Sequence, residues 1–332
     1  MKVYIDVMGG DAPSRIIEGG LLAAKDHPET GVVFVGDEAL IRRTVSDANA
    51  GSLGTETIAA TDAITNDDAP AMAIRTKKDS SLVRAFNMLK EDGDSLGLVS
   101  AGSTGAVLTG ATLMIGRMDG IYRPTLLSQL PTSDGGSVCI TDSGANMDSK
   151  PEWLYQFAVM GSAYMSAVTG KERPSVALLN VGTEDHKGNE LTHGTFPLLA
   201  ASKLNFVGNM EARDTLTGKY DVIVCDGYNG NVLLKSSEGA VRMVMKLLKQ
   251  TIMSSTSAKI GYLFMKKAFG KLRAAMDYNN YGGGPFLGVK KPVIKAHGSS
   301  NAQAIRQCVN QLLAIKAGGV ADAIKEGIDN SR

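Results

Sequence analysis

Short apolar runs alternate with segments of helical spacing along this chain, and glycine repeatedly follows the apolar runs. The sequence predicts strands at residues 2–7, 31–35, 96–100, 137–141, 175–180, 206–207 and 221–225. Helical spacing occupies residues 16–24, 106–115 and 152–168. Such alternation is typical of an α/β fold in which helices cover both faces of a mostly parallel sheet.

The length of the chain limits how this sheet is organised. Single hydrophobic cores stop growing beyond roughly 250–300 residues, and this chain has 332 residues. We therefore expect one α/β unit over residues 1–332, divided into two lobes with the site between them. No tandem repeat or low-complexity segment interrupts it.

Composition excludes several classes of protein. Hydrophobic residues make up 43% and charged residues 21%, and the net charge of +1 supplies no global field that would attract nucleic acid. The three cysteines form no CxxC pair, so we expect a reducing compartment rather than a disulfide framework. The N-terminal apolar run is too short for a signal peptide, and no apolar run is long enough to span a membrane. Together these features predict a cytoplasmic protein.

Four strand-to-loop junctions, residues 6–11, 100–106, 142–146 and 226–231, combine glycine with Ser, Thr, Asn or Asp. Glycine lets backbone approach a ligand, and a following helix offers free N–H groups, so these junctions favour a phosphate or carboxylate. Turns of any α/β protein also need glycine, and neither GxxxxGK[ST] nor a strand followed by GxGxxG is present. The candidate binding residues are Asp6, Gly9, Gly10, Ser103, Thr104, Gly105, Asn146, Asp226 and Gly230, with Asn231 as a possible oxyanion donor.

The densest polar segment is residues 180–190, directly after a predicted strand. Lys187, beside Gly188, can extend into a site as a point charge. A solvated loop is the alternative, but its place at a strand end favours function. Its candidate residues are Asn180, Gly182, Thr183, Glu184, His186, Lys187 and Asn189.

The sequence gives little indication of a nucleophilic side chain or of a metal site. No GxSxG elbow is present, and the four histidines lack metal-ligand spacing with cysteine. Aspartates at positions 142, 148, 221 and 226 could hold Mg²⁺ or serve as turn residues and helix caps. We predict no metal and no cofactor.

Residues 259–276 form a basic amphipathic segment. On a helix, Met265, Phe269, Leu272 and Met276 share one face, and lysines with one arginine cover most of the remainder. Such a helix suits an anionic membrane, the protein's own core or a partner subunit, or an acidic partner protein. We expect this segment to lie within a helical protrusion formed by residues 250–280.

These segments together resemble the PlsX family, bacterial phosphate acyltransferases that act on acyl–acyl carrier protein. The resemblance runs from residue 6 to about residue 309, over nearly the whole chain. The similar stretches are residues 6–11 (DVMGGD), 75–81 (RTKKDSS), 100–106 (SAGSTGA), 142–146 (DSGAN), 180–191 (NVGTEDHKGNEL), 208–214 (GNMEARD), 226–235 (DGYNGNVLLK), 281–289 (YGGGPFLGV) and 295–300 (KAHGSS). Three departures are a missing histidine after Asp11, Ser103 where the family commonly has Asn, and Ser143 where it commonly has an apolar residue.

The resemblance implies a fold like that of isocitrate and isopropylmalate dehydrogenases and of phosphotransacetylase. It also implies a homodimer with a cleft near the subunit interface, and it places Lys187 and Asn231 at catalytic positions. A helical tip that contacts the membrane corresponds to Ile260, Leu263, Phe264 and Phe269. Localisation is then cytoplasmic with peripheral membrane association.

The implied reaction converts acyl–acyl carrier protein and inorganic phosphate to acyl phosphate and free carrier, for phosphatidic acid and phospholipid synthesis. The implied partners are acyl carrier protein, the membrane surface and a downstream glycerol-3-phosphate acyltransferase. Arg75, Lys77 and Lys78 could attract the acidic carrier or phosphate, or form a solvated turn. Three rival functions stay open: a phosphotransacetylase-like acyl-CoA enzyme, a metal- and NAD-dependent dehydrogenase, and a non-catalytic membrane scaffold for lipid enzymes.

Overall fold

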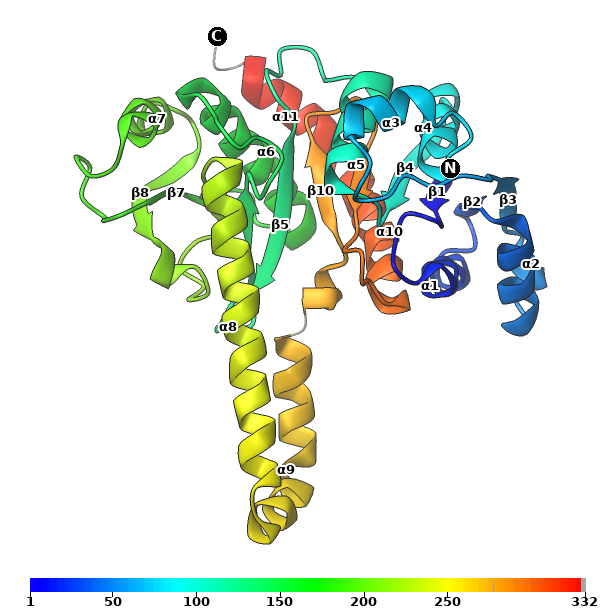
Figure 1. The fold of residues 1–332 in the computed structure, drawn as a ribbon. Coiled ribbons are helices and arrows are strands. Elements are labelled where there is room, and N and C mark those ends of the chain that lie inside the picture. The colour runs from blue at the N-terminus through cyan, green and yellow to red at the C-terminus, as the bar shows by residue number, and fades with distance from the viewer. Residues whose placement is uncertain (277, 330–332) are drawn as a thin grey trace.

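A computed structural model describes residues 1–276 and 278–329 (Figure 1). Its strands are β1 (Lys2–Asp6), β2 (Gly31–Gly36), β3 (Glu56–Ala59), β4 (Ser95–Ser100), β5 (Thr125–Pro131), β6 (Ser137–Thr141), β7 (Ser175–Asn180), β8 (Asn205–Glu211), β9 (Val222–Val224), β10 (Gly284–Leu287) and β11 (Val293–Lys295). Its α-helices are α1 (Pro13–Asp26), α2 (Glu38–Asp47), α3 (Pro70–Thr76), α4 (Ser81–Glu91), α5 (Thr104–Gly110), α6 (Pro151–Thr169), α7 (Glu190–Ala200), α8 (Gly227–Met253), α9 (Thr256–Ala275), α10 (Ala302–Ala317) and α11 (Val320–Asp329). A short π-helix, Ala111–Ile115, continues α5.

One sheet of 11 strands runs through the described residues in the order β3-β2-β1-β4-β11-β10-β5-β6-β9-β7-β8. The first five strands in this order are parallel to one another, and so are the last four. Between them, β10 is antiparallel to β11 and β5, and β5 is antiparallel to β6. The two parallel groups therefore run in opposite directions. This mostly parallel sheet with flanking helices confirms the predicted fold class, although the strand ends do not share one edge.

Both faces of the N-terminal half of the sheet are buried. Along β1, Val3 and Ile5 pack into the core on the side of α1 and α10, whereas Tyr4 packs into the core on the side of α4. Burial on two faces explains the nearly continuous apolar run of this strand, because a strand with one wet face would alternate. Helices α1 and α10 approach so closely that a Cβ on Gly19 would lie 2.5 Å from the Ala302 carbonyl oxygen.

Helix α6 is apolar on most of its surface because neighbours cover it from several sides. It packs on β6, β7 and β9 and also contacts α7, α10 and α11. Phe157, Met160 and Tyr164 are fully buried. Gly161 allows the close approach to the sheet, since a Cβ there would lie 2.7 Å from Cγ1 of Val222.

All seven strands predicted from the sequence are present, and four others were not predicted. β3 is exposed on most of its residues, and β5 contains Ser128, Gln129 and Pro131. β10 begins Gly-Pro, and β11 has only three residues. Their pairing partners, rather than their own patterns, make these segments strands.

Helices α8 and α9 lie side by side and project from the body as a hairpin (Figure 1). Of the protrusion expected over residues 250–280, the described residues form the end of α8, all of α9 and most of a 3-10 turn, Tyr278–Tyr281, whereas residue 277 lies outside the described residues. Ile260, Leu263 and Phe264 are 52%, 69% and 87% exposed, whereas the ring of Phe269 is partly covered and lies 5.5 Å from that of Tyr262. Among the described residues, no helix is long and apolar enough to cross a bilayer.

Candidate functional site

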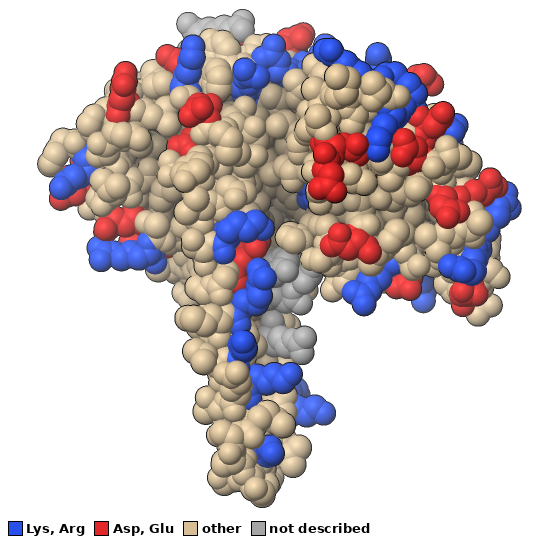
Figure 2. Space-filling view, in the orientation of Figure 1, with Lys and Arg blue, Asp and Glu red and all other residues tan. Residues whose placement is uncertain are grey.

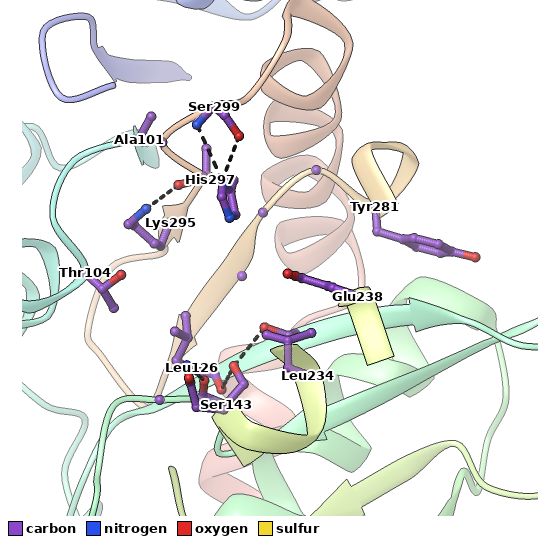
Figure 3. A pocket seen from close by; sticks show the side chains of 18 of the residues that line it. Ala101, Thr104, Leu126, Ser143, Leu234, Glu238, Tyr281, Lys295, His297 and Ser299 are labelled. Carbon is purple, nitrogen blue, oxygen red and sulfur yellow. Dashed lines mark hydrogen bonds between the residues drawn. The ribbon is translucent and has the colours of Figure 1, made fainter. Parts of the chain in front are cut away.

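A cavity of about 470 Å³ lies where the two halves of the sheet meet (Figure 3). Its walls come from the loops after β4, β6 and β11, the start of β10, the middle of β5 and the first turns of α8. In Figure 3, Lys295, His297 and Ser299 occupy one side, and Ser143, Leu234 and Glu238 occupy the other. Further lining residues are Asp11, Asn66, Gly102, Thr104, Ser128, Gln129, Asn231, Lys235 and Tyr281.

Asp6 joins the first two glycine loops behind this cavity. Its fully buried carboxylate accepts hydrogen bonds from Ser81 Oγ at 2.6 Å and Ser100 Oγ at 2.7 Å. Burial raises the pKa of Asp6, while these hydroxyls and the backbone N–H groups of Met8 and Gly9 oppose the rise. A Cβ on Gly9 would lie 2.5 Å from this carboxylate. Asp6 and Gly9 therefore build the wall and do not line the cavity.

The neighbouring glycine, Gly10, also has a packing role. A Cβ there would lie 2.9 Å from Cβ of Ala101 and 3.1 Å from the Gly298 carbonyl oxygen. Asp11 follows, and its N–H donates to that same oxygen at 2.9 Å. The first loop is thus held against the loop after β11.

Of the three candidates in the loop after β4, only Thr104 lines the cavity. Ser103 is the N-cap of α5 and makes no side-chain capping bond. Gly105 allows contact with α3, because a Cβ there would lie 2.8 Å from Cγ of Pro70.

In the loop after β6, Asp142 occupies the position expected for a bound anion. Its buried carboxylate accepts the N–H groups of Gly144, Ala145 and Asn146 at 3.1, 3.0 and 2.7 Å. Burial raises the pKa of Asp142, and these hydrogen bonds oppose the rise. Asn146 donates its side-chain amide to Asp142 and to the Pro124 carbonyl, both at 2.8 Å. Asn146 therefore stabilises the loop, and these three amides are occupied by the protein itself.

The fourth junction places Asn231 at the cavity. Asp226 caps α8 by accepting the Asn229 N–H at 2.8 Å. Gly230 lies against the loop after β6, where no side chain would fit. One turn of helix then presents Asn231, whose Nδ2 donates to the Ser143 carbonyl at 3.2 Å. Asp226 and Gly230 position the helix, and Asn231 lines the cavity.

The polar loop after β7 is held by its own hydrogen bonds. Asn180 Nδ2 donates to the Lys187 carbonyl at 2.9 Å, and Asn189 caps α7 in a reciprocal pair with Thr192. The Glu184 carbonyl accepts from Asn209 Nδ2 at 2.9 Å. A further bond joins the His186 carbonyl to the His193 ring at 3.1 Å. Thr183, Glu184, His186 and Lys187 are exposed, and Gly182 is buried.

Within a single chain, Lys187 does not line the cavity that Asn231 lines, although the resemblance places both at catalytic positions. Asn180, Gly188 and Asn189 instead line a second cavity of about 480 Å³ on another side of α8. The two cavities lie on different sides of α8: Asn231 and Lys235 line the first, whereas Asn229, Val232 and Ser236 line the second, beside the loop after β7.

Sequence reasoning missed the cations of the cavity. Lys295 ends β11, and burial lowers its pKa to about 8. The pKa of His297 is lowered by burial and by the charge of Lys235. Lys235 also lowers the pKa of Lys295, and Lys235, Lys295 and His297 all line the cavity. Both lysines lie in stretches that resemble the PlsX family, residues 226–235 and 295–300. Lys295 was not recognised as a site residue because the strand that ends with it has only three residues.

Glu238 is the acidic partner within the cavity wall. Its carboxylate lies 3.0 Å from Nζ of Lys235 and 3.7 Å from Nη2 of Arg242, and its side chain is 8% exposed. No group of three or more His, Cys, Asp or Glu that could hold a metal ion occurs among the described residues.

Burial raises the pKa of Cys308 to about 12, so that thiol stays protonated.

The fatty acid synthesis protein family matches residues 1–322. The phosphate acyltransferase of Brevibacillus brevis is 46% identical over 332 residues, covering 100% of this chain and 98% of that protein. The phosphate acyltransferase of Clostridioides difficile is 44% identical over 329 residues, covering 99% of this chain and 96% of that protein.

Solved structures with a similar fold are far more distant in sequence. A phosphotransacetylase from Streptococcus pyogenes has a TM-score of 0.58 at 16% identity, covering 95% of this chain and 94% of that one. A branched-chain phosphotransacylase from Enterococcus faecalis has a TM-score of 0.55 at 12% identity, covering 95% of this chain and 98% of that one. At such identities the similarity establishes the fold alone.

Proposed function

Because this chain belongs to the fatty acid synthesis protein (PlsX) family and is a phosphate acyltransferase, we propose that its acyl donor is acyl–acyl carrier protein. Inorganic phosphate accepts the acyl group, and the products are acyl phosphate and free carrier for phosphatidic acid and phospholipid synthesis. The observation that carries this proposal is the full-length similarity to phosphate acyltransferases. The polar cavity between the two sheet halves is where we place the reaction.

The chemistry requires positioning more than proton transfer. A phosphate oxygen attacks the thioester carbonyl, a tetrahedral oxyanion forms, and the carbon–sulfur bond then breaks as the carrier thiolate leaves. A thiol of pKa about 8.5 leaves without a strong general acid. The protein's task is therefore to hold the anion beside the carbonyl and to stabilise the oxyanion.

Asn231 is the proposed oxyanion donor. Its Nδ2 carries two hydrogens, of which one donates to the Ser143 carbonyl at 3.2 Å. The other is available for an oxyanion in the cavity, because Asn231 is part of the cavity wall. Removing one such donor typically costs about 10²–10³ in turnover.

Lys187 can take part in the reaction if the protein is a homodimer. Within one chain this exposed side chain lies outside the cavity lined by Asn231. We therefore place the subunit interface near the cavity, so that Lys187 of one protomer reaches the site of the other. C2 symmetry would then complete two equivalent sites.

We place the hairpin at an anionic membrane surface. Between residues 239 and 276 the sequence has eight Lys and Arg and no Asp or Glu, so this segment carries +8 and the rest of the chain −7. Figure 2 shows basic side chains along the hairpin below the body. Exposed Ile260, Leu263 and Phe264 add apolar contact, whereas Phe269 contributes less because its ring packs near Tyr262. Such docking would hold this cytoplasmic enzyme at the inner surface of the membrane. There it could deliver acyl phosphate to a downstream glycerol-3-phosphate acyltransferase.

The second candidate is an enzyme that takes its acyl group from coenzyme A. The names of the similar phosphate acyltransferases do not specify the acyl donor, so this candidate is tested beside the first. The family assignment makes the chain an acyltransferase, so a non-catalytic scaffold is set aside.

The test incubates purified protein with phosphate and either palmitoyl–acyl carrier protein, palmitoyl-CoA or acetyl-CoA. Hydroxylamine traps acyl phosphate as a hydroxamate, which mass spectrometry identifies. We expect palmitoyl phosphate from the carrier-bound donor at the highest kcat/KM. Acetyl phosphate from acetyl-CoA, with no product from the carrier-bound donor, would overturn the proposal in favour of the second candidate.

A further inference from the structure

Many backbone N–H groups of the glycine loops around the cavity donate hydrogen bonds to oxygen atoms of the protein itself. The N–H groups of Met8 and Gly9 bond Asp6, and those of Gly144, Ala145 and Asn146 bond Asp142. The Gly102 N–H bonds the Ser100 hydroxyl at 3.1 Å, and the Asn229 N–H bonds Asp226 at 2.8 Å. A phosphate in this cavity would have to compete with buried carboxylates for those donors.

Two lysines from distant parts of the chain provide another way to hold an anion. Lys295, at the end of β11, and Lys235, on the third turn of α8, both line the cavity. Lys295 is largely removed from water, and its ammonium group donates a hydrogen bond to a neutral oxygen, the Ala296 carbonyl. A desolvated ammonium gains more from an incoming anion than a solvated one does.

We propose that Lys295 and Lys235 together form the subsite that holds inorganic phosphate, while the glycine loops mainly shape its walls. This inference rests on the proposed function, because it assigns the acceptor of that reaction to one end of the cavity. Asn231, on the same helix as Lys235 and one turn earlier, would then face the thioester carbonyl beside the bound phosphate.

The ion pairs around Glu238 make Lys235 available to an anion. Glu238 is bonded by Lys235 at 3.0 Å and is also within 3.7 Å of Arg242. If Lys235 turns toward phosphate, Arg242 remains to neutralise the Glu238 carboxylate. The charge of Asp11 on the opposite wall opposes anion binding, so both lysines are needed for a net attraction.

The decisive measurement is phosphate binding without any acyl donor. Inorganic phosphate is titrated into wild-type protein, Lys295→Met and Lys235→Met, and heat is recorded by calorimetry. Losing one charge-assisted contact should weaken phosphate binding about 10–100-fold in each variant. Lys290→Met is the matched control, because Lys290 is 57% exposed and lies outside the cavity; its affinity should equal that of wild type.

Steady-state kinetics give a second readout. We expect each cavity variant to raise the KM for phosphate while leaving the KM for the acyl donor nearly unchanged, and Lys295→Arg to restore part of the phosphate affinity. Thermal melting monitored by circular dichroism verifies folding. Wild-type phosphate affinity in folded Lys295→Met would overturn the inference. If lysine-dependent phosphate binding persists but no acyl transfer is found, the proposed function fails while this subsite stands.

Discussion

A Cβ on Gly230 would lie 1.8 Å from the carbonyl oxygen of Asp142, so the first turn of α8 lies directly against the loop after β6. No side chain fits in that gap, and the Cys225 sulfur lies only 2.9 Å from the same point. This contact connects the helix that carries Asn231 and Lys235 to the loop that carries Ser143. The geometry of the cavity therefore depends on a glycine that does not line it.

Gly230→Ala should displace α8 from this loop. We expect a loss of about 1–3 kcal/mol in the free energy of unfolding, as for an overpacked core, together with a clear loss of turnover. Urea denaturation and acyl phosphate formation measure the two effects. Gly239→Ala is the control, since nothing lies within 4 Å of a Cβ there and the same helix should gain about 0.5–1 kcal/mol. Equal stability of the two variants would contradict the argument.

Asn231→Ala and Lys187→Ala should each lower turnover about 10²–10³-fold, with little loss of stability because Asn231 makes one 3.2 Å bond and Lys187 is exposed. Mixing the two variants under subunit exchange tests the shared site. If Lys187 of one protomer serves Asn231 of the other, mixed dimers hold one intact site, and about a quarter of wild-type activity should return. No recovery, despite demonstrated exchange, would place both residues in one subunit's site.

Leu263→Ser combined with Phe264→Ser should weaken binding to vesicles that contain anionic lipid. These side chains are 69% and 87% exposed, so their loss should not affect the fold or turnover with acyl donor in solution. Sedimentation with vesicles measures binding, and raising the salt concentration should weaken the wild type through its basic residues. Val181→Ser, at an equally exposed site on the body, is the control. Unchanged sedimentation of the double variant would refute membrane docking by the tip.

The KM for phosphate should rise as pH increases through about 8, because burial lowers the pKa of Lys295 to about 8 and only its protonated form attracts the anion. Bound phosphate favours the charged form and moves the transition upward. Neighbouring groups do not mimic this transition: the lowered pKa of His297 keeps that ring neutral here, and the pKa of Cys308 is about 12. Asp6 and Asp11 also act on Lys295. In Lys295→Met the pH dependence in this range should disappear; its persistence would assign the transition to another group.

The sequence predicted most of what depends on local pattern. Continuous apolar runs identified β1, β2, β4, β6 and β7, because a strand buried on both faces needs apolar residues at successive positions. Four strands were not predicted, among them the three-residue strand β11, whose last residue is Lys295. A charged residue after two apolar ones carries no local signal, and only pairing with β4 and β10 reveals the strand.

Among the candidate site residues too, the sequence showed which loops matter but not which side chains reach the cavity. Thr104 and Asn231 line the cavity as their loop positions suggested, whereas Asp6, Gly9 and Asn146 support it from behind. Glycine and amide content showed that these loops approach something closely. It did not show that Asp6 and Asp142 are what the amides approach, because a carboxylate of the chain and a bound phosphate place the same demand on nearby sequence.

By itself, the sequence determined the α/β class, the order of most elements and the basic, apolar character of the hairpin, since each follows from patterns within one element. Tertiary structure decided which residues meet. The reversal of strand direction between β11 and β6 sets Lys295 opposite Lys235 and leaves Lys187 outside the cavity of its own chain. Strand order depends on pairing between segments far apart in the chain, and that pairing follows from the packing of the whole sheet rather than from any local pattern.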